Sequence, residues 1–378
     1  MQVQSVAIAW QVYSVRHSAF DLGLVGLVLF TPSLVLAPVT GLVADRFDRR
    51  AVVAVTSVVQ IGVCAALIPL SARHGPGALG VVLAVLAVAG TARAFRYPAA
   101  ASLLPAIVPP EEYMRANSGA SAVREVMQVG GPAAGGVLVA LSPSAAYGTA
   151  IVAFALGAAF TLAIPLLHRV RTEAGLAWRD VFAGLQFLRA KPVLSGAISL
   201  DLFAVLFGGA TALLPIYAAQ VFHTGPAGFG ALRASVALGT ALCALVLARR
   251  PIHRHAGPRL LAAVACFGAA TIAFGLSTSL WIAIPALALL GAADMVSMAI
   301  RDALIALGTP DAMRGRVTAV EGVFIVASNE LGEFESGTLA AFVGAVPAVV
   351  IGGVATLAVV ALWAWRNPSL RTADRVGA

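Results

Sequence analysis

The side chains that could do chemistry in this sequence are carboxylates placed inside long apolar runs. Glu330 and Glu333 are three residues apart and share one face of a helix, whereas Glu335 lies about 140° around the helix from Glu330. Two neighbouring carboxylates cannot both ionise cheaply, so one of them can hold a proton near neutral pH. We expect Glu330 and Glu333 to exchange protons, with Asp201 or Asp294 as the alternatives.

Basic side chains in the same runs support a second, purely structural interpretation. A charge inside a membrane is costly, so it is paired or faces a water-filled cavity. The carboxylates could therefore pair with Arg93, Arg124 or Arg301 and only fix helix packing. Arg124 and Glu125 are adjacent, so they point in different directions and are not expected to pair with each other. The candidate charge network is Arg93, Arg96, Arg124, Glu125, Asp201, Asp294, Arg301, Asp302, Glu330, Glu333 and Glu335, and the same runs also contain Glu321 and Asn329.

The elements that position these residues are expected to be membrane helices. Of 378 residues, 60% are hydrophobic and 11% are charged, against about 25% charged in a typical soluble domain. A helix that crosses a bilayer needs about 20 residues, and every span must be helical because lipid offers an open backbone no partner. The apolar runs predict spans near 1–15, 20–44, 51–71, 78–103, 117–141, 146–167, 193–221, 228–248, 259–279, 281–307, 317–342 and 346–365.

The first run is shorter than the others. At about 1.5 Å per residue, residues 1–15 do not cross a hydrocarbon core of about 30 Å. Either this run is a partial span or an upstream segment completes helix 1, and we expect the second. The predicted fold class is therefore all-α, a polytopic membrane protein with twelve helices in two sets of six and with helix 1 truncated.

The basic residues predict the orientation of the chain in the membrane. If the loop after the second span is cytoplasmic and the sides alternate, eighteen Lys and Arg residues fall on the cytoplasmic side and only Arg16 and Arg73 fall opposite. The net charge of +8 is then a signal of topology rather than of nucleic-acid binding. We expect a multi-pass protein of the cell (inner) membrane with a cytoplasmic C-terminus.

Two features divide the chain into halves. The longest loop contains apolar residues at helical spacing from Leu176 to Arg189, which predicts an amphipathic helix on the cytoplasmic surface. The loops before the fifth and eleventh spans repeat, because Pro110, Met114 and Arg115 recur as Pro310, Met313 and Arg314. The expected domains are an N-terminal six-helix bundle at 1–167, an amphipathic linker at 168–192, a C-terminal six-helix bundle at 193–366 and a cytoplasmic tail at 367–378.

The loop after the second span contains the most specific motif. It reads Gly41-Leu-Val-Ala-Asp45-Arg46-Phe47-Asp48-Arg49-Arg50. This resembles the signature Gly-x-x-x-Asp-Arg-x-Gly-Arg-Arg between helices 2 and 3 of the major facilitator superfamily, with Asp48 in place of the second glycine. We interpret it as a gate, in which Gly41 lets helices approach, Asp45 meets a helix N-terminus or an arginine, and the arginines Arg46, Arg49 and Arg50 stabilise the cytoplasmic face. The alternative is a charged loop that only sets topology.

The fifth span contains a second motif. Its core, Gly131-Pro132-Ala133-Ala134-Gly135-Gly136, is similar to the antiporter motif of that superfamily's exporters, although Met127 stands where a further glycine is usual. Small residues permit close helix contact, and Pro132 removes a backbone hydrogen bond and permits a bend. Helix packing without a transport role is the alternative interpretation, because Gly and Pro are common in membrane helices.

Over essentially its full length the chain resembles the major facilitator superfamily, and the Asp45 loop, the Pro310 loop and the run 328–336 are most similar to its siderophore (enterobactin-type) exporter branch. The resemblance implies a secondary active transporter, specifically a proton-coupled exporter of a small siderophore-like or amphipathic molecule that works by alternating access. The alternatives are a multidrug efflux transporter, an importer, or a non-transporting membrane sensor or scaffold.

Other classes are disfavoured by what the sequence lacks. It contains no Ser/His/Asp set, no Walker phosphate-binding loop and no paired metal-binding histidines. We therefore expect no enzymatic activity, no cofactor and no metal site, and an ion gradient as the energy source. The expected partners are a small-molecule substrate, protons and the lipid bilayer, with no nucleic acid and a monomeric state.

Overall fold

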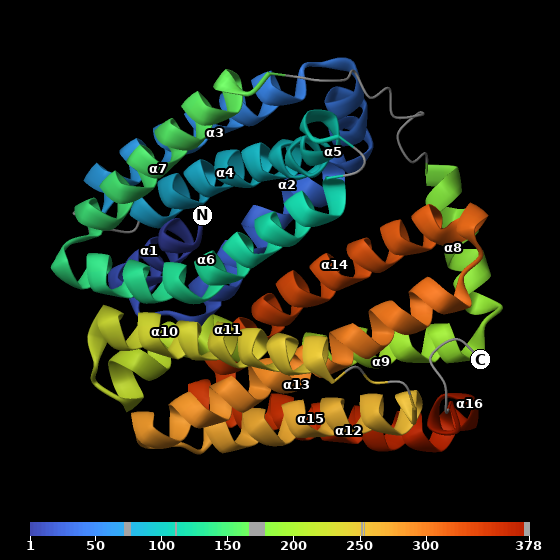
Figure 1. Cartoon of the computed structure of the whole chain (residues 1–378). Helices are drawn as coiled ribbons and strands as arrows, with labels where there is room; N and C mark the ends of the chain where they lie inside the picture. The colour runs from blue at the N-terminus through green and yellow to red at the C-terminus, as the bar shows by residue number, and fades with distance from the viewer. Residues whose placement is uncertain (72–76, 110–111, 166–177, 251, 253, 374–378) are drawn as a thin grey trace. The chain divides into compact units, whose positions relative to one another are not determined.

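Long apolar runs separated by short polar or glycine-containing turns fold into helices, because backbone groups in lipid must bond within their own segment. The computed structural model describes residues 1–71, 77–109, 112–165, 178–250, 252 and 254–373. All regular structure within these residues is helical (Figure 1). The chain divides into two compact units, one formed by Met1–His17 and Val25–Ala177 and the other by Ser18–Leu24 and Trp178–Ala378.

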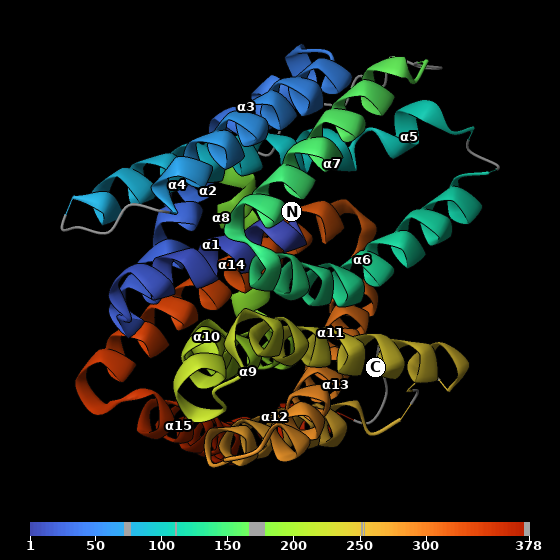
Figure 2. The ribbon, with the colours of Figure 1, turned by 90° about the vertical axis from the view of Figure 1, so that its left-hand side faces the viewer.

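The first unit is built around α3, which packs against both α4 and α7 (Figure 2). Side chains define two of its helix starts, since Asp48 accepts a hydrogen bond from Arg50 N (2.9 Å) and Ser142 accepts one from Ala145 N (3.0 Å). Its core contains the buried side chains of Ile8, Leu67 and Tyr147. The helices are α1 (Gln2–Arg16), α2 (Ala19–Arg46, whose first residues belong to the second unit), α3 (Arg49–Leu70), α4 (Ala78–Ala101), α5 (Leu104–Ile107), α6 (Tyr113–Leu141) and α7 (Pro143–Ala163).

In the second unit, α13 packs against α11 and α12, and α15 packs against α12 and α9. Leu200, Leu260 and Val317 are fully buried in its core. The helices are α8 (Trp178–Arg189), α9 (Pro192–Phe207), η1 (Ala210–Leu213), α10 (Leu214–Ile216), η2 (Tyr217–Val221), α11 (Gly225–Arg249), α12 (Ala256–Gly275), α13 (Leu280–Gly308), α14 (Asp311–Val343), α15 (Ala345–Arg366) and α16 (Pro368–Arg371).

Nine helical segments in the described part of the chain are long and apolar enough to cross a membrane. They are Ala19–Leu36, Arg49–Leu70, Leu79–Ala101, Pro143–Ala163, Pro192–Val221, Gly225–Arg249, Ala256–Gly275, Leu280–Gly308 and Ala345–Arg366. The other three predicted spans correspond to α1, α6 and α14, of which α1 has 15 residues and α6 and α14 have 29 and 33. The all-helical polytopic fold is confirmed, and the count of twelve and the truncation of helix 1 remain predictions.

The predicted run 193–221 corresponds to the helical segment Pro192–Val221, which is interrupted within its length. The helix α9 ends at Phe207, and η1, α10 and η2 follow Gly208 and Gly209. Glycine weakens a helix because it loses the most backbone freedom on ordering. The break also lies against α14, since a Cβ atom added to Gly209 would be 2.7 Å from the Oγ of Ser336.

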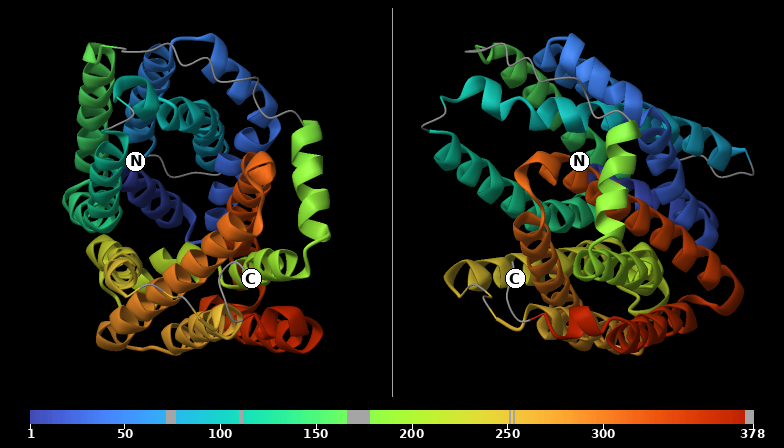
Figure 3. Two further views of the ribbon diagram at one scale, coloured as in Figure 1. Left: turned by 45° about the vertical axis from the view of Figure 1, so that its right-hand side comes forward. Right: turned by 90° about the vertical axis from the view of Figure 1, so that its right-hand side faces the viewer.

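The amphipathic segment of the linker forms α8, which lies against α14 (light green in Figure 3). Leu188 of α8 is buried in the core of the second unit. The approach to α14 is close, because a Cβ atom added to Gly184 would be 2.7 Å from the carbonyl oxygen of Arg316. At the C-terminal end Leu370 of α16 is fully buried, with α16 packed on α9 and α12. Residues 166–177 of the linker lie outside the described residues, and the predicted domain boundaries remain predictions.

Candidate functional site

Arg301 on α13 is the centre of a charge cluster in the second unit. Its guanidinium pairs with Asp201 of α9 and with Glu321 of α14, where Nε lies 3.1 Å from Oε1. The side chains of Arg301, Asp201 and Glu321 are 3%, 9% and 8% exposed. Asp302 is a weaker partner, 3.7 Å from Arg301 and 59% exposed. The cluster therefore joins three helices through ion pairs in the interior of the unit.

Helical spacing brings two more polar side chains of α13 to the same face. Asp294, Ser297 and Arg301 are three and four residues apart, which places them along one side of the helix. Ser297 Oγ donates a hydrogen bond to Asp201 Oδ1 at 3.3 Å. A cavity of about 10 Å³, roughly the room that one water molecule needs, is lined by Asp201, Ala204, Val205, Val264, Phe267, Asp294 and Ser297.

The charges of this cluster do not balance. Without counting the exposed Asp302, the carboxyls of Asp201, Glu321 and Asp294 lie near one guanidinium, so their full ionisation leaves two negative charges unbalanced. Unpaired charge in a buried site is costly, and a carboxyl can avoid that cost by keeping its proton. The carboxyls of this cluster are therefore candidates for taking up and releasing a proton.

The predicted proton pair on α14 lies outside this cluster. Glu330 and Glu333 are both half-buried, and neither takes part in the ion pairs of Arg301. Among the described residues, Arg233 of α11 is a cation close enough for its charge to act on Glu333. Glu335 accepts a hydrogen bond from Ser336 Oγ at 3.4 Å.

Glu321 is the site residue that sequence reasoning did not place in the network. It occurs in the same polar run of α14, but its contact with Arg301 spans twenty positions of sequence and two helices. Asp201, Asp294, Arg301 and Asp302 were predicted, and the structure brings the three aspartates near the guanidinium of Arg301, with Asp302 at its exposed edge.

In the first unit, the predicted arginines of α4 contact neutral oxygens on other helices. Arg93 Nη2 donates to Gln4 Oε1 of α1 at 3.3 Å, and Arg96 Nη1 donates to Ser57 Oγ of α3 at 2.5 Å. Gln4 Nε2 in turn donates to Gln60 Oε1 of α3 at 2.8 Å. These hydrogen bonds join α4 to α1 and α3.

The predicted neighbours Arg124 and Glu125 lie in α6. Arg124 is exposed. The side chain of Glu125 lies outside the described residues, so the expectation that the two do not pair remains a prediction.

The arginines of the motif at 41–50 join three helix ends within the first unit. Arg49 Nη1 donates to the carbonyl of Ser102, just after α4, at 3.2 Å. Arg50 Nη1 donates to the carbonyl of Ile164, just after α7, at 2.8 Å, and Arg50 Nη2 pairs with Asp48 at 2.8 Å. Hydrogen bonding to Arg50 lowers the pKa of the Asp48 carboxyl below its ordinary value. Asp48, which replaces the usual glycine, thus caps α3 with its side chain.

The other members of this motif are in α2. Arg46 is the last residue of α2 and is exposed. The backbone of Gly41 and Asp45 is helical, whereas the side chain of Asp45 and the surroundings of Gly41 lie outside the described residues. The role predicted for them as a gate therefore remains a prediction.

The glycines of the second motif lie where α6 meets α1. A Cβ atom added to Gly131 would be 2.6 Å from the Cβ of Gln2, and one added to Gly135 would be 3.1 Å from the Cα of Val3. Pro132 and Gly136 are buried in the same stretch. The motif therefore permits a close approach of two helices, as the packing interpretation requires.

Comparison with known families decides the class of protein. The model of the Major Facilitator Superfamily matches residues 1–332. The chain belongs to this superfamily. Among curated relatives of the chain, the enterobactin exporter EntS of Citrobacter koseri is 26% identical over 356 residues, which cover 92% of this chain and 83% of that protein. The enterobactin exporter EntS of Shigella dysenteriae is 26% identical over 360 residues, which cover 93% of this chain and 84% of that protein.

Solved structures of superfamily-type transporters share the fold. A bacterial homologue of the iron transporter ferroportin, in an inward-facing state, superposes with a TM-score of 0.72 at 15% identity. The superposition covers 97% of this chain and 95% of the homologue. The human organic anion transporter MFSD10 gives a TM-score of 0.60 at 19% identity, and the superposition covers 90% of this chain and 83% of MFSD10. As a superfamily member, the protein is a multi-pass membrane transporter of a small molecule and not an enzyme.

Proposed function

We propose that the protein is a proton-coupled exporter of a small, siderophore-like molecule and works by alternating access. The observation that supports the coupling is the excess of carboxyls around Arg301, which is 3% exposed. The curated relatives named as enterobactin exporters support both export and a siderophore-like substrate.

In this proposal the proton acts on helix packing. Ionised Glu321 pairs with Arg301, and this pair joins α14 to α13. A proton on Glu321 would remove its charge and weaken that connection, whereas a proton on Asp294 would reduce repulsion against Asp201. Proton binding would thus favour one of two arrangements of α9, α13 and α14, and such a bias is the physical requirement for coupling.

The remaining roles follow the sequence expectations. Glu330 and Glu333 are the second candidate for the proton site. The motif from Gly41 to Arg50 would act as the gate, and Arg93 and Arg96 would shape the inner face of the first unit. We further propose that the protein is monomeric, lies in the inner membrane and has its C-terminus in the cytoplasm.

Transport into everted vesicles tests the coupling. Enterobactin is the probe, and the gradient is acid inside, so that export appears as uptake. We expect Asp294→Asn and Glu321→Gln to lose uptake driven by the gradient but to retain exchange of substrate across the membrane, because exchange needs no net proton movement. Asp302→Asn is the matched control, since Asp302 is 59% exposed.

A double variant separates the two candidate sites for the proton. If Glu330→Gln with Glu333→Gln abolishes the gradient dependence while the variants at Asp294 and Glu321 keep it, the proton site lies on the other face of α14. If uptake by the wild-type chain survives a protonophore, proton coupling itself is wrong.

Untargeted mass spectrometry of the medium tests export independently of the chosen probe. Cells that express the chain, an Asp45→Asn variant or an empty vector are compared, with the protein quantified in the membrane fraction. We expect a siderophore-like or amphipathic metabolite in the medium only with the intact chain. The same metabolites at the same levels in the medium of all three strains would contradict export.

A further inference from the structure

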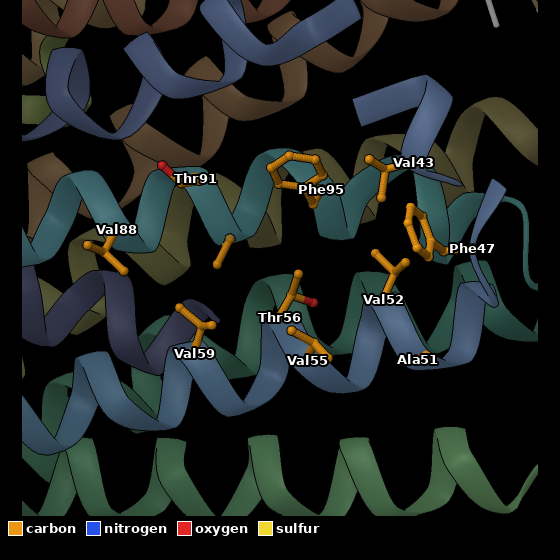
Figure 4. Close-up of a pocket in the computed structure, with 11 residues that line it drawn as sticks. Val43, Phe47, Ala51, Val52, Val55, Thr56, Val59, Val88, Thr91 and Phe95 are labelled. Atoms are coloured by element: carbon orange, nitrogen blue, oxygen red, sulfur yellow. The ribbon is translucent and has the colours of Figure 1, made fainter. Parts of the chain in front are cut away.

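An apolar groove runs between α3 and α4 and ends at α2 (Figure 4). Its volume is about 470 Å³. Val88 and Phe95 line it from α4, Val55 and Val59 line it from α3, and Phe47 lies at one end. The complete lining is Val43, Phe47, Ala51, Val52, Val55, Thr56, Val59, Val88, Thr91, Ala92 and Phe95.

No polar group of the lining is available to a ligand. The only hydroxyls belong to Thr56 and Thr91, and each donates to a carbonyl of its own helix, Val53 O at 3.0 Å and Ala87 O at 2.9 Å. A polar transport substrate would lose its hydration here without gaining a hydrogen bond. The groove therefore suits a hydrocarbon chain and not the polar part of a substrate.

The groove opens outward on helices that are long and apolar enough to span the membrane. Val55 is 61% exposed and Val88 is 50% exposed, on α3 and α4 respectively. Ala51 and Val59 are eight residues apart, so the α3 side of the groove is about 12 Å long. One leaflet of acyl chains is about 15 Å deep. The groove thus matches the length of an acyl chain within a single leaflet.

Positive charge lies at the end of the groove where α2 stops. Arg46 follows Val43 by three residues, which places both on the same side of α2, and Arg46 is exposed. The negative charge of Asp48 is compensated by Arg50 at 2.8 Å. Arg49 is buried and donates to the carbonyl of Ser102, so among the described side chains at this end the exposed positive charge is that of Arg46, which attracts a phosphate.

We propose that this groove is a binding site for one anionic phospholipid, with an acyl chain between α3 and α4 and the phosphate at Arg46. The lipid would lie beside Phe47, within the motif at 41–50. Bound lipid would thus contact the turn between α2 and α3, whose arginines join the ends of α4 and α7.

Photocrosslinking in nanodiscs tests occupation of the groove. Phosphatidylglycerol with a photoreactive acyl chain should label peptides that contain Val55 and Val88. Val55→Trp fills the groove and should remove most of the labelling. Val58→Trp is the matched control, because Val58 is on the same helix and 62% exposed but does not line the groove. Val88→Trp and Val81→Trp repeat the comparison on α4, where Val81 is 50% exposed.

Competition tests the headgroup. Unlabelled phosphatidylglycerol should displace the probe about fivefold better than phosphatidylcholine, as expected for one basic residue at an anionic headgroup. Arg46→Gln should remove this preference and leave labelling of the groove. Size-exclusion profiles and thermal unfolding confirm that each variant is folded.

Two results would overturn the proposal. Equal labelling of folded Val55→Trp and Val58→Trp would show that no acyl chain occupies the groove. Equal competition by the two lipids in the wild-type chain would show that the site does not select an anionic headgroup.

Discussion

Arg301 supplies the positive charge that Asp201 and Glu321 share, so its removal leaves buried carboxylates without a cation. We expect Arg301→Gln to lower the free energy of unfolding by about 3–5 kcal/mol, the usual cost of breaking a buried ion pair by removing one partner. Denaturant unfolding in detergent measures this change in the free energy of unfolding. Adding Asp201→Asn to Arg301→Gln should recover part of the loss, because it removes one of the uncompensated charges.

A matched control comes from an arginine without a buried environment. Arg124 on α6 is exposed, so Arg124→Gln should change the free energy of unfolding by less than about 0.5 kcal/mol. A similar loss for Arg124→Gln and Arg301→Gln would contradict the special role of the cluster.

Asp48 gives a second test, in which stability depends on pH. Arg50 and the start of α3 hold the folded pKa of Asp48 below its ordinary value. The stabilisation is therefore present above the unfolded pKa of about 3.9 and is lost as the pH falls through the folded pKa. We expect the stability advantage of the wild-type chain over Asp48→Ala, about 1 kcal/mol for a helix cap, to shrink in acid when followed by thermal unfolding in detergent.

The glycine that is usual at this position of the motif provides the control for Asp48. Glycine is a tolerated helix cap, so Asp48→Gly should cost only a few tenths of a kcal/mol. An advantage over Asp48→Ala that grows as the pH falls would contradict the direction of the pKa shift.

The charged candidates were recognisable in the sequence because a charge inside an apolar run is conspicuous. Helical periodicity shows which residues of one helix share a face, as it did for Glu330 and Glu333. It does not show which helices face each other. Arg301 contacts Asp201 across 100 positions of sequence and Glu321 across 20. Periodicity within one helix therefore could not predict that these three residues meet, or that Glu321 belongs to the cluster.

Among the helices, the approach of α6 to α1 depends on two glycines. A side chain at Gly131 or Gly135 meets Gln2 or Val3, whereas a Cβ atom added to Gly130 meets nothing within 4 Å. We expect Gly131→Val and Gly135→Val each to cost about 1–3 kcal/mol through overpacking. Gly130→Ala should be neutral or stabilising by up to about 1 kcal/mol, because alanine favours a helix. Thermal unfolding measures the stability of the three variants. An equal loss of stability in all three would contradict close packing at the motif.

The break after α9 offers a second test among the helices. A Cβ atom added to Gly209 would meet the backbone of Gly332 and the Oγ of Ser336, whereas one added to Gly62 of α3 would meet nothing within 4 Å. Gly209→Ala should therefore destabilise the protein in thermal unfolding, and Gly62→Ala should not. A stabilised Gly209→Ala variant would show that the two helices are not in close contact there.

Helix positions were more predictable than helix interruptions. Hydropathy located α3, α12 and α15 to within a few residues, because each span must be apolar over its length. The break at Gly208–Gly209 left no comparable signal, since glycine is also common in continuous membrane helices. Only the fit of that segment against α14 distinguishes it from an unbroken helix.

The distribution of basic residues predicts the orientation of the whole molecule in the membrane. Eighteen basic residues are assigned to one side of the membrane and two to the other, a bias that predicts which side is cytoplasmic. Single cysteines test it in a chain whose native Cys64, Cys243 and Cys266 are replaced by alanine. Gly77→Cys lies on the side predicted to be external, and Pro310→Cys and Thr372→Cys lie on the side predicted to be cytoplasmic.

All three positions are exposed, so a maleimide can reach them from the correct side. In intact spheroplasts, a membrane-impermeant maleimide should label Gly77→Cys alone, and permeabilised spheroplasts should show labelling of all three. Labelling of Pro310→Cys and Thr372→Cys in intact spheroplasts would reverse the orientation. The same result would place the proposed lipid at Arg46 in the outer leaflet, because Arg46 and Pro310 are predicted to lie on one side of the membrane. The side of the membrane on which the gate motif and the lipid site lie therefore depends on the orientation of the whole chain, which this labelling measures.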